Sequence, residues 1–411
     1  MTRRVAVTGC GVVTPAGCEL EAFWGSLMRG ECMLKPLRTF SFRDFESLVG
    51  GEVTLPAEDE LPADLDADRS RARCLELALA AAKRAVTQAA LPSDGAFRER
   101  TGVVMGTTLG EERQVGDLSD RTAIDRAAGR EEESIDAGFF ARSDNHRLAA
   151  VTAARYGLGG PVVLSAAACS SGNAAIATAY DLIQMGAADC MIAGAADTLV
   201  RSIYCGFFRM GALSKSVCRP YDKNRDGVSF GEGAGVLVLE DFEVAKKRGA
   251  RILAEVAGFG LSNDAHHVTA PDPTGRGFTR AIQQALATTS TPLDAVDYVS
   301  AHGTGTLYSD LCEVRALYAV FGDRAKTLPM SSIKSMIGHT NGAASAIEAV
   351  ACVLAMSHQA VPPTVNLIEQ DPECVIDCVP GKGRDAKVGT CLNLSAGFGG
   401  FNACVVLRGA P

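Results

Sequence analysis

Three Gly-rich segments, far apart in the chain, each present one reactive side chain. They are Cys169 in AAACSSG, His302 in AHGTGT and His339 in KSMIGHTNGAA. A cysteine thiolate can hold an acyl group as a thioester, and imidazole N–H groups can stabilise an oxyanion or an enolate at a neighbouring carbonyl. Together the three side chains predict carbon–carbon bond formation between thioesters.

The elements expected around Cys169 explain how one cysteine among fourteen becomes a nucleophile. The apolar run 162–164 predicts a strand, and apolar residues spaced by three and four predict a helix over 170–185. Unpaired N–H groups at the start of this helix would lower the pKa of the Cys169 thiol, and small neighbours leave room for a thioester. The alternative, and the commoner role of a cysteine, is a small buried hydrophobe.

Both histidines are expected where regular elements end or begin. His302 follows the strand-like VDYVSA, and His339 precedes an apolar segment, 342–356, that predicts a buried helix. Lys334 follows the strand-like MSSI. Glu348 lies inside the buried helix, where an unpaired carboxylate is costly, so we expect it to pair with Lys334. Taken singly, such residues are more often satisfied polar groups or solvated charges.

In this order the motifs resemble the β-ketoacyl-acyl carrier protein synthases, closest to type II elongating enzymes and polyketide ketosynthases. The resemblance covers nearly the whole chain and includes VAVTGCGVVTPAG (5–17), RPYDKNRDGVSFGEGAGVLVLE (219–240), PPTVNL (362–367) and GFGGFN (397–402). It implies a catalytic triad of Cys169, His302 and His339, with the family's lysine at Lys334 and its buried glutamate at Glu348. Relatives primed by acyl-CoA have Asn at the second histidine and thiolases have a second cysteine, so His339 disfavours both.

The resemblance also implies the reaction. A carrier protein's 4'-phosphopantetheine delivers an acyl group to Cys169, whose backbone N–H forms an oxyanion hole with that of Phe398. Malonyl carrier then loses CO2, and donation from His302 and His339 stabilises the enolate, which attacks the acyl group to give a β-ketoacyl product. This chemistry needs neither a metal nor a redox cofactor.

Further positions match family residues that contact the substrate. Thr304 and Thr306 match threonines that bind pantetheine, Thr269 is a weaker candidate, Phe398 matches the gating aromatic, and Leu109 and Phe207 match residues lining the acyl pocket. Departures from the family pattern are Ala396, Phe401, Leu307, Asn341 and Ser345, where Phe, Thr, Pro, Leu and Gly are common. We expect Phe401 to refill the volume that Ala396 leaves, and a specialised polyketide or polyene pathway.

The fold that the resemblance implies is the thiolase fold, an α/β architecture of five αβαβα layers built from two similar halves. Strand-like and helical segments alternate along the chain, as this fold requires. We expect residues 1–250 to form the half with the cysteine and residues 251–411 the half with the two histidines. The charged stretch 111–145 is expected to be helical cover or a subunit contact.

Composition predicts a cytosolic enzyme that binds neither membranes nor nucleic acid. The chain has 47% hydrophobic residues and a net charge of -8, without a membrane-spanning apolar stretch or a leader before the strand expected at Val5. Fourteen cysteines without a regular framework predict free thiols. A zinc site at Cys374, Cys378, Cys391 and Cys404 is disfavoured because the last two lie in strand-like runs and no histidine pair accompanies them.

The expected partners are an acyl carrier protein and a second subunit. Residues that border the entrance in the family form a basic rim for the carrier: Arg201, Arg209, Lys215 and Arg219. A second basic cluster, 246–248, is better explained as a solvated helix end. The resemblance implies a homodimer, or a heterodimer with a subunit like a chain-length factor. The alternative is that this chain is itself such a non-catalytic partner, which the presence of Cys169 and both histidines disfavours.

Overall fold

The computed structural model describes residues 3–40, 48–59, 72–130, 139 and 143–410, and its centre is one ten-stranded mixed sheet. The strands run in the order β11-β10-β14-β15-β9-β1-β8-β6-β4-β5. Five come from the first half of the chain: β1 (Val5–Val13), β4 (Thr101–Gly106), β5 (Val162–Ser165), β6 (Cys190–Asp197) and β8 (Gly233–Asp241). Five come from the second: β9 (Ala254–Asn263), β10 (Tyr298–Ser300), β11 (Met330–Ser331), β14 (Thr390–Gly397) and β15 (Phe401–Gly409). The strands predicted from apolar runs are confirmed.

The two sets of five strands have the same topology. In the first set β1 pairs antiparallel with β8 and β8 with β6, whereas β6, β4 and β5 are mutually parallel. In the second set β9, β15 and β14 are antiparallel neighbours, whereas β14, β10 and β11 are parallel. A short antiparallel pairing of β1 with β9 joins the sets. The boundary between residues 250 and 251 stays a prediction, which this repeated topology supports.

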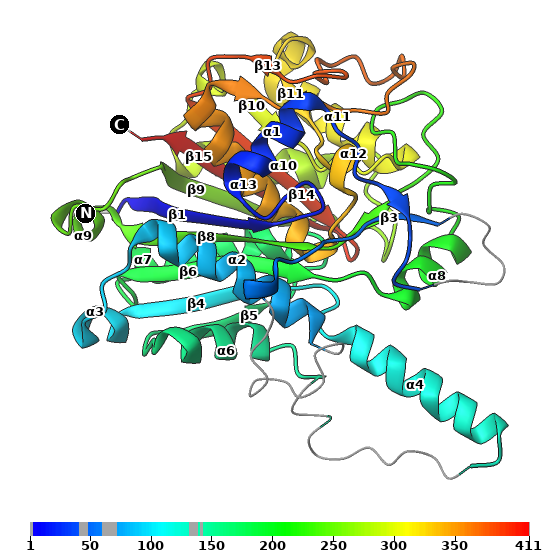
Figure 1. Cartoon of the computed structure of the whole chain (residues 1–411). Coiled ribbons are helices and arrows are strands. Elements are labelled where there is room, and N and C mark those ends of the chain that lie inside the picture. Colours follow the sequence, from blue (N-terminus) through cyan, green and yellow to red (C-terminus); the bar gives the residue numbers. More distant parts are fainter. Residues whose placement is uncertain (1–2, 41–47, 60–71, 131–138, 140–142, 411) are drawn as a thin grey trace.

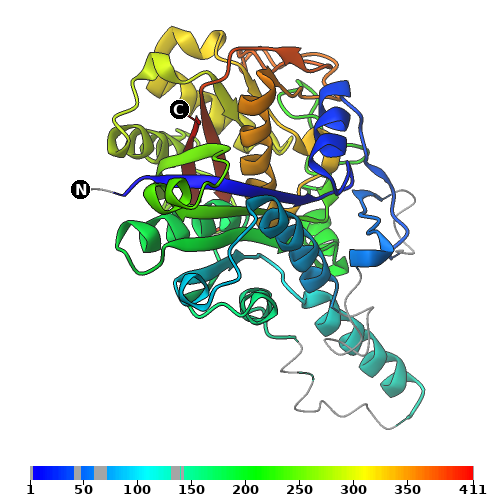
Figure 2. The same cartoon turned by 60° about the vertical axis from the view of Figure 1, so that its left-hand side comes forward.

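Helices form three layers around the two half-sheets (Figures 1 and 2). The outer layers are α2 (Arg73–Ala89) with α6 (Arg147–Tyr156), and α10 (Arg276–Thr288) with α11 (Leu307–Phe321). The central layer is α7 (Ser171–Gln184) with α13 (Ala344–His358). Because sheets cover α13 on both sides, its residues 344–356 are all buried, as its apolar sequence predicts. The five expected αβαβα layers are confirmed.

The remaining elements are short or lie at the periphery. The helices are α1 (Leu20–Arg29), α3 (Gly95–Glu99), α4 (Glu112–Ala127), α8 (Arg201–Arg209), α9 (Phe242–Lys247) and α12 (Lys334–Ile337). The strands are β2 (Lys35–Pro36), β3 (Val49–Gly51), β7 (Phe230–Gly231), β12 (Ala360–Val361) and β13 (Arg384–Asp385). Helix α4 projects from the body and contacts α8 (Figure 1). It covers the first part of the charged stretch 111–145; residues 131–138 and 140–142 lie outside the described residues. None of the described helices is long and apolar enough to cross a bilayer.

Candidate active site

A strained turn between β5 and α7 presents Cys169. The preceding residue, Ala168, has a φ of 48°, in the left-handed region that side chains other than glycine rarely adopt. The Ser171 hydroxyl fixes the turn, because it donates to the Ala168 carbonyl at 2.7 Å and accepts from the Ala167 N–H at 2.9 Å. The helix begins at Ser171, so Cys169 lies just before its first turn, as expected.

One cavity of about 360 Å³ brings together most of the predicted site residues. Cys169, His302 and His339 all line it. So do Thr269, Thr304, Thr306, Phe207 and Phe398. Leu109 is not among its lining residues, nor are the buried Lys334 and Glu348. Chain segments more than 100 residues apart therefore meet around one space that is mostly apolar.

Two carboxylates on α11 hold the loop that carries His302. Glu313 accepts from the backbone N–H groups of His302 and Gly303 at 2.6 and 2.9 Å. Asp310 accepts from those of Thr304 and Gly305, both at 3.1 Å. Burial raises the pKa of Glu313 to about 7 and that of Asp310 to about 6, although these N–H donors lower both. Sequence reasoning missed both residues; their signal is a pair of acids three residues apart on a largely apolar helix.

The backbone of His339 is fixed by the short strand β7. Its N–H donates to the Ser229 carbonyl at 2.7 Å, and its carbonyl accepts from the Gly231 N–H at 3.1 Å. A Cβ on Gly338, whose φ is 80°, would lie 2.6 Å from the Phe230 carbonyl, so only glycine permits this approach. The imidazole lies edge-to-face with that of His302, at 5.7 Å between centroids.

Both imidazoles are held in the neutral form. Burial lowers the pKa of His302 and of His339 well below the usual value, and the charge of Lys334 lowers both further. Nδ1 of each ring is buried without a hydrogen-bond partner among the described residues. A buried orphan N–H costs more than a buried lone pair, so the favoured tautomer carries its proton on Nε2. Each histidine therefore offers an Nε2–H donor to a ligand in the cavity.

Lys334 and Glu348 form the expected ion pair. The Lys334 ammonium donates to Glu348 Oε1, and each side chain is only 1% exposed. Burial raises the pKa of Glu348 to about 7 despite the neighbouring ammonium. The pair is close enough to the histidines for the Lys334 charge to act on them.

The expected lowering of the Cys169 pKa is wrong. Burial raises the pKa of this thiol to about 12, and the Lys334 charge offsets only part of the rise. Asp197 adds to the rise because its carboxylate disfavours a second negative charge nearby. The position before a helix was predicted correctly, but the loss of water around the sulfur has the larger effect on its pKa.

Asp197, at the end of β6, ties two loops of the site together. Its side chain is fully buried and accepts from Thr107 Oγ1 and from the N–H groups of Thr108, Leu109, Gly110 and Gly342, at 2.7–3.2 Å. One loop carries Leu109, and the other leads from His339 into α13. Sequence reasoning missed this residue, whose signal is an acid that ends an otherwise apolar strand.

The turn between β14 and β15 carries Phe398 and approaches the nucleophile. A Cβ on Gly397 would lie 2.9 Å from the Ala168 Cβ and 3.0 Å from the Cys169 nitrogen, so the two turns touch. Ala396 lines the cavity as expected. Phe401 does not refill the space beside Ala396, because it does not line the cavity and is 42% exposed. As the first residue of β15, it lies opposite Gly397 in the hairpin.

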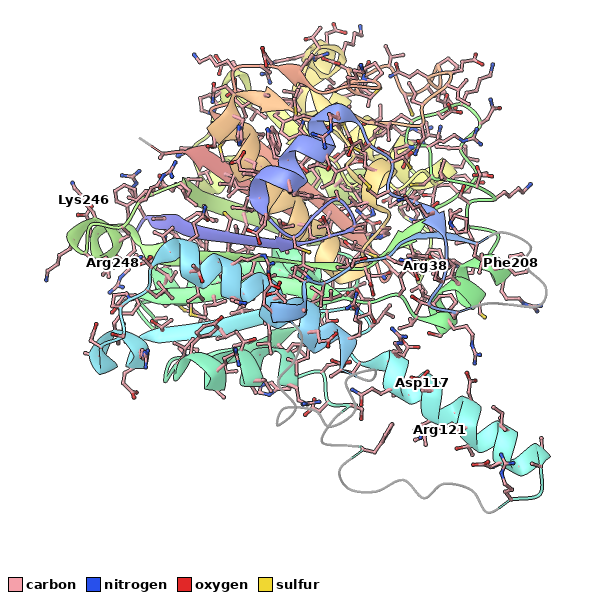
Figure 3. The ribbon with its side chains drawn as sticks, in the orientation of Figure 1. Arg38, Asp117, Arg121, Phe208, Lys246 and Arg248 are labelled. Atoms are coloured by element: carbon pink, nitrogen blue, oxygen red, sulfur yellow. The ribbon has the colours of Figure 1, made fainter. Side chains whose placement is uncertain are left out.

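The two predicted basic clusters lie at different ends of the molecule. Arg209 is exposed at the end of α8, next to Met210 of the cavity lining. Figure 3 shows Lys246 and Arg248 near α9, at the opposite end from Phe208 of α8. Arg248 pairs with Glu240 at 2.5 Å. Lys246 and Lys247 are exposed, as expected of a solvated helix end, whereas Arg248 is half-buried against Glu240, so that interpretation is wrong for Arg248.

Known proteins match this chain along its whole length. Residues 2–245 match the family model for the beta-ketoacyl synthase N-terminal domain, and residues 253–368 match that for the C-terminal domain. The chain is 36% identical to 3-oxoacyl-[acyl-carrier-protein] synthase 2 of Synechocystis sp., over 99% of this chain and 98% of that protein. It is 36% identical to the tetracenomycin polyketide synthase ketoacyl synthase alpha subunit of Streptomyces glaucescens, over 98% of this chain and 97% of that one. The solved ishigamide ketosynthase/chain length factor superposes with a TM-score of 0.93 at 36% identity, covering both chains completely.

The fold is thus the thiolase fold of the ketosynthases, with its cysteine and two histidines around one cavity. The chain belongs to the β-ketoacyl synthase family. It is an acyltransferase of the β-ketoacyl-acyl carrier protein synthase type.

Proposed function

We propose that this chain joins an acyl group held on Cys169 to malonyl-acyl carrier protein, releasing CO2 and giving a β-ketoacyl-acyl carrier protein. The observation that carries the proposal is the single cavity lined by Cys169, His302 and His339. An acyl group on the sulfur and a malonyl thioester beside the imidazoles would share that space. Proximity of this kind supplies a large part of the rate enhancement of a two-substrate reaction.

In the first half-reaction, the Cys169 sulfur attacks the acyl thioester of the carrier. The new sulfur–carbon bond forms as the pantetheine sulfur leaves, and the proton of the Cys169 thiol ends on that departing sulfur. The N–H groups of Cys169 and Phe398 are the proposed oxyanion hole, which the close contact of Gly397 with the Cys169 nitrogen supports.

In the second half-reaction, the bond between the malonyl carboxylate and the α-carbon breaks. CO2 leaves, and the electron pair develops on the thioester oxygen as an enolate that accepts from Nε2–H of His302 and His339. The α-carbon attacks the acyl carbonyl and expels the Cys169 sulfur as a thiolate, which takes up a proton from solvent to restore the thiol. Burial keeps both imidazoles neutral, the charge of Lys334 adds to this effect, and Glu348 fixes Lys334.

The partners follow from family membership. We propose that an acyl carrier protein delivers both substrates on its phosphopantetheine arm, with Thr304, Thr306 and Thr269 at the arm and exposed Arg209 and Lys215 near the entrance. The second subunit is a copy of this chain or a subunit like a chain-length factor. Leu109 remains a proposed acyl-pocket residue. The cytosolic location and the specialised polyketide or polyene pathway stay predictions.

Intact-protein mass spectrometry tests the proposal. Wild type and Cys169→Ala are exposed to acyl-carrier thioesters of different length and unsaturation, and then to malonyl carrier. We expect an acyl adduct on wild type alone, discharged into a lengthened product. We expect His302→Ala and His339→Ala to be acylated but not to decarboxylate malonyl carrier. An adduct on Cys169→Ala would refute the choice of nucleophile, and no adduct with any primer, even with a co-purified partner, would favour a non-catalytic subunit.

A further inference from the structure

A continuous column of aromatic rings connects the rim of the cavity with His339. Phe398 stacks on Phe207 of α8 with 5.2 Å between centroids and 6° between ring planes. Phe207 packs edge-to-face on Phe230 at 4.9 Å, and Phe230 stacks on the His339 imidazole at 6.2 Å and 19°. All three separations lie in the range over which aromatic rings attract each other.

The two ends of the column differ in freedom. Phe398 is 38% exposed and belongs to a turn with three glycines, of which Gly399 and Gly400 have φ values near 80°. Phe230 is fully buried in β7, whose backbone pairs with β3 and bridges to His339. Because the Phe230 backbone is fixed, the ring contacts are the route by which a displacement of the Phe207 ring can reach His339 through β7.

Among the described residues, the His339 ring makes aromatic contacts but no hydrogen bond. No described residue hydrogen-bonds to the imidazole, and its Nδ1 is buried without a partner. A catalytic histidine is usually oriented by a hydrogen bond to the nitrogen that does not react. Here the ring contacts are the face of Phe230 and the edge of His302. His302 has a separate aromatic neighbour, Phe278, which lies outside the column.

We propose that Phe230 is a positioning residue for His339, and that Phe207 and Phe230 couple the position of Phe398 to decarboxylation. The proposal rests on the proposed function. An acyl chain on Cys169 enters the cavity that Phe398 and Phe207 line, and so competes with their stacking. Phe207 then repacks on Phe230, and Phe230 turns the imidazole toward the malonyl oxygen. The stacking energy of one ring pair corresponds to a coupling of about two- to tenfold in rate.

The experiment compares CO2 release from malonyl carrier by free and by pre-acylated enzyme in single turnovers. The primer is the one that acylates Cys169 fastest in the mass-spectrometric panel. Phe230→Leu and Phe207→Leu are compared with Phe259→Leu, which removes a ring from an edge-to-face pair with Tyr180 on another part of the sheet. The rate of Cys169 acylation is measured for every variant.

We expect acylation to speed CO2 release by wild type and by Phe259→Leu about two- to tenfold. Phe230→Leu is expected to slow CO2 release about tenfold or more, with acylation changed less than about twofold. For Phe207→Leu we expect acylated and free enzyme to release CO2 at nearly the same rate. This variant tests the coupling even if Phe230→Leu fails to fold.

Different results overturn different parts of the proposal. If Phe230→Leu slows acylation as much as CO2 release, its role is structural. The coupling is refuted if acylation speeds CO2 release by Phe207→Leu as much as by wild type. It is also refuted if acylation does not speed CO2 release by wild type. Failure of wild type to become acylated at all would refute the proposed function, and the coupling with it.

Discussion

The buried ion pair of Lys334 and Glu348 predicts that its two members contribute unequally to stability. Burial raises the pKa of Glu348 to about 7 even with the ammonium beside it. Without that ammonium the pKa rises further, and the carboxyl takes up a proton at neutral pH at little cost. We therefore expect Lys334→Met to lower the free energy of unfolding by only about 1–2 kcal/mol.

Glu348→Leu leaves a buried ammonium without its partner. A lysine in the unfolded chain has a pKa of about 10.4, so neutralising one at pH 7 costs at most ~4.6 kcal/mol. We expect Glu348→Leu to lower the free energy of unfolding by about 3–5 kcal/mol at pH 7. The folded variant then binds fewer protons than the unfolded chain, so its stability rises with pH, by up to ~1.4 kcal/mol per pH unit. The penalty should thus shrink between about pH 7 and pH 9.

Guanidinium unfolding followed by tryptophan fluorescence measures these differences. Trp24 is the single tryptophan and is buried, and it stacks on His358 at the end of the helix that carries Glu348. The double variant should lose less than the sum of the single losses, because it leaves no unpaired charge. Equal losses from the two single variants, with no dependence on pH, would refute the reasoning and indicate a hydrated pair.

Three other results follow from the same site. Because burial raises the pKa of Cys169 to about 12, its alkylation by iodoacetamide should accelerate about tenfold per pH unit between about pH 7 and pH 10; a plateau below pH 8 would show a stabilised thiolate. Lys334→Met removes a charge that lowers the pKa of both histidines, so the acid limb of malonyl decarboxylation should move to higher pH; an unchanged limb in the pH–rate profile would exclude this role. Asp197→Asn places an amide among five donors and should lower the free energy of unfolding in guanidinium by about 1.5–3 kcal/mol. A decrease below about 0.5 kcal/mol would contradict the role of Asp197 in holding the two loops together.

The sequence predicts the parts of the site that depend on local pattern. Apolar runs mark most strands of the ten-stranded sheet, and Gly-rich segments mark the turns at Cys169, His302 and His339. That these turns meet could not be predicted in this way, because β5 and β10 lie in different half-sheets, and the packing of α7 against α13 between those half-sheets brings the turns together. The pairing of Lys334 with Glu348 follows from the cost of an unpaired charge in a buried helix.

Residues that act through tertiary contacts could not be predicted in this way. Asp197 accepts from Gly342, 145 positions away, and nothing near either residue signals the contact. Phe230 lies in a run of ordinary strand composition, and its ring contacts with Phe207 and His339 exist only in the folded chain. The prediction of a lowered Cys169 pKa fails for the same reason, because local sequence gives the helix start but not how closely the folded chain packs around the sulfur.

The absence of charge on the cysteine and histidines explains how one cavity serves both half-reactions. Burial raises the pKa of the Cys169 thiol and lowers those of His302 and His339, so all three are neutral in the free enzyme at physiological pH. Three neutral reactive groups suit an acyl chain and keep Nε2–H donors in place for the enolate, where low polarity strengthens each hydrogen bond. The cost is a weak nucleophile, so the thiol proton must leave as the pantetheine sulfur departs. Acylation therefore depends on the carrier thioester being seated in the cavity, which protects the sulfur from other electrophiles.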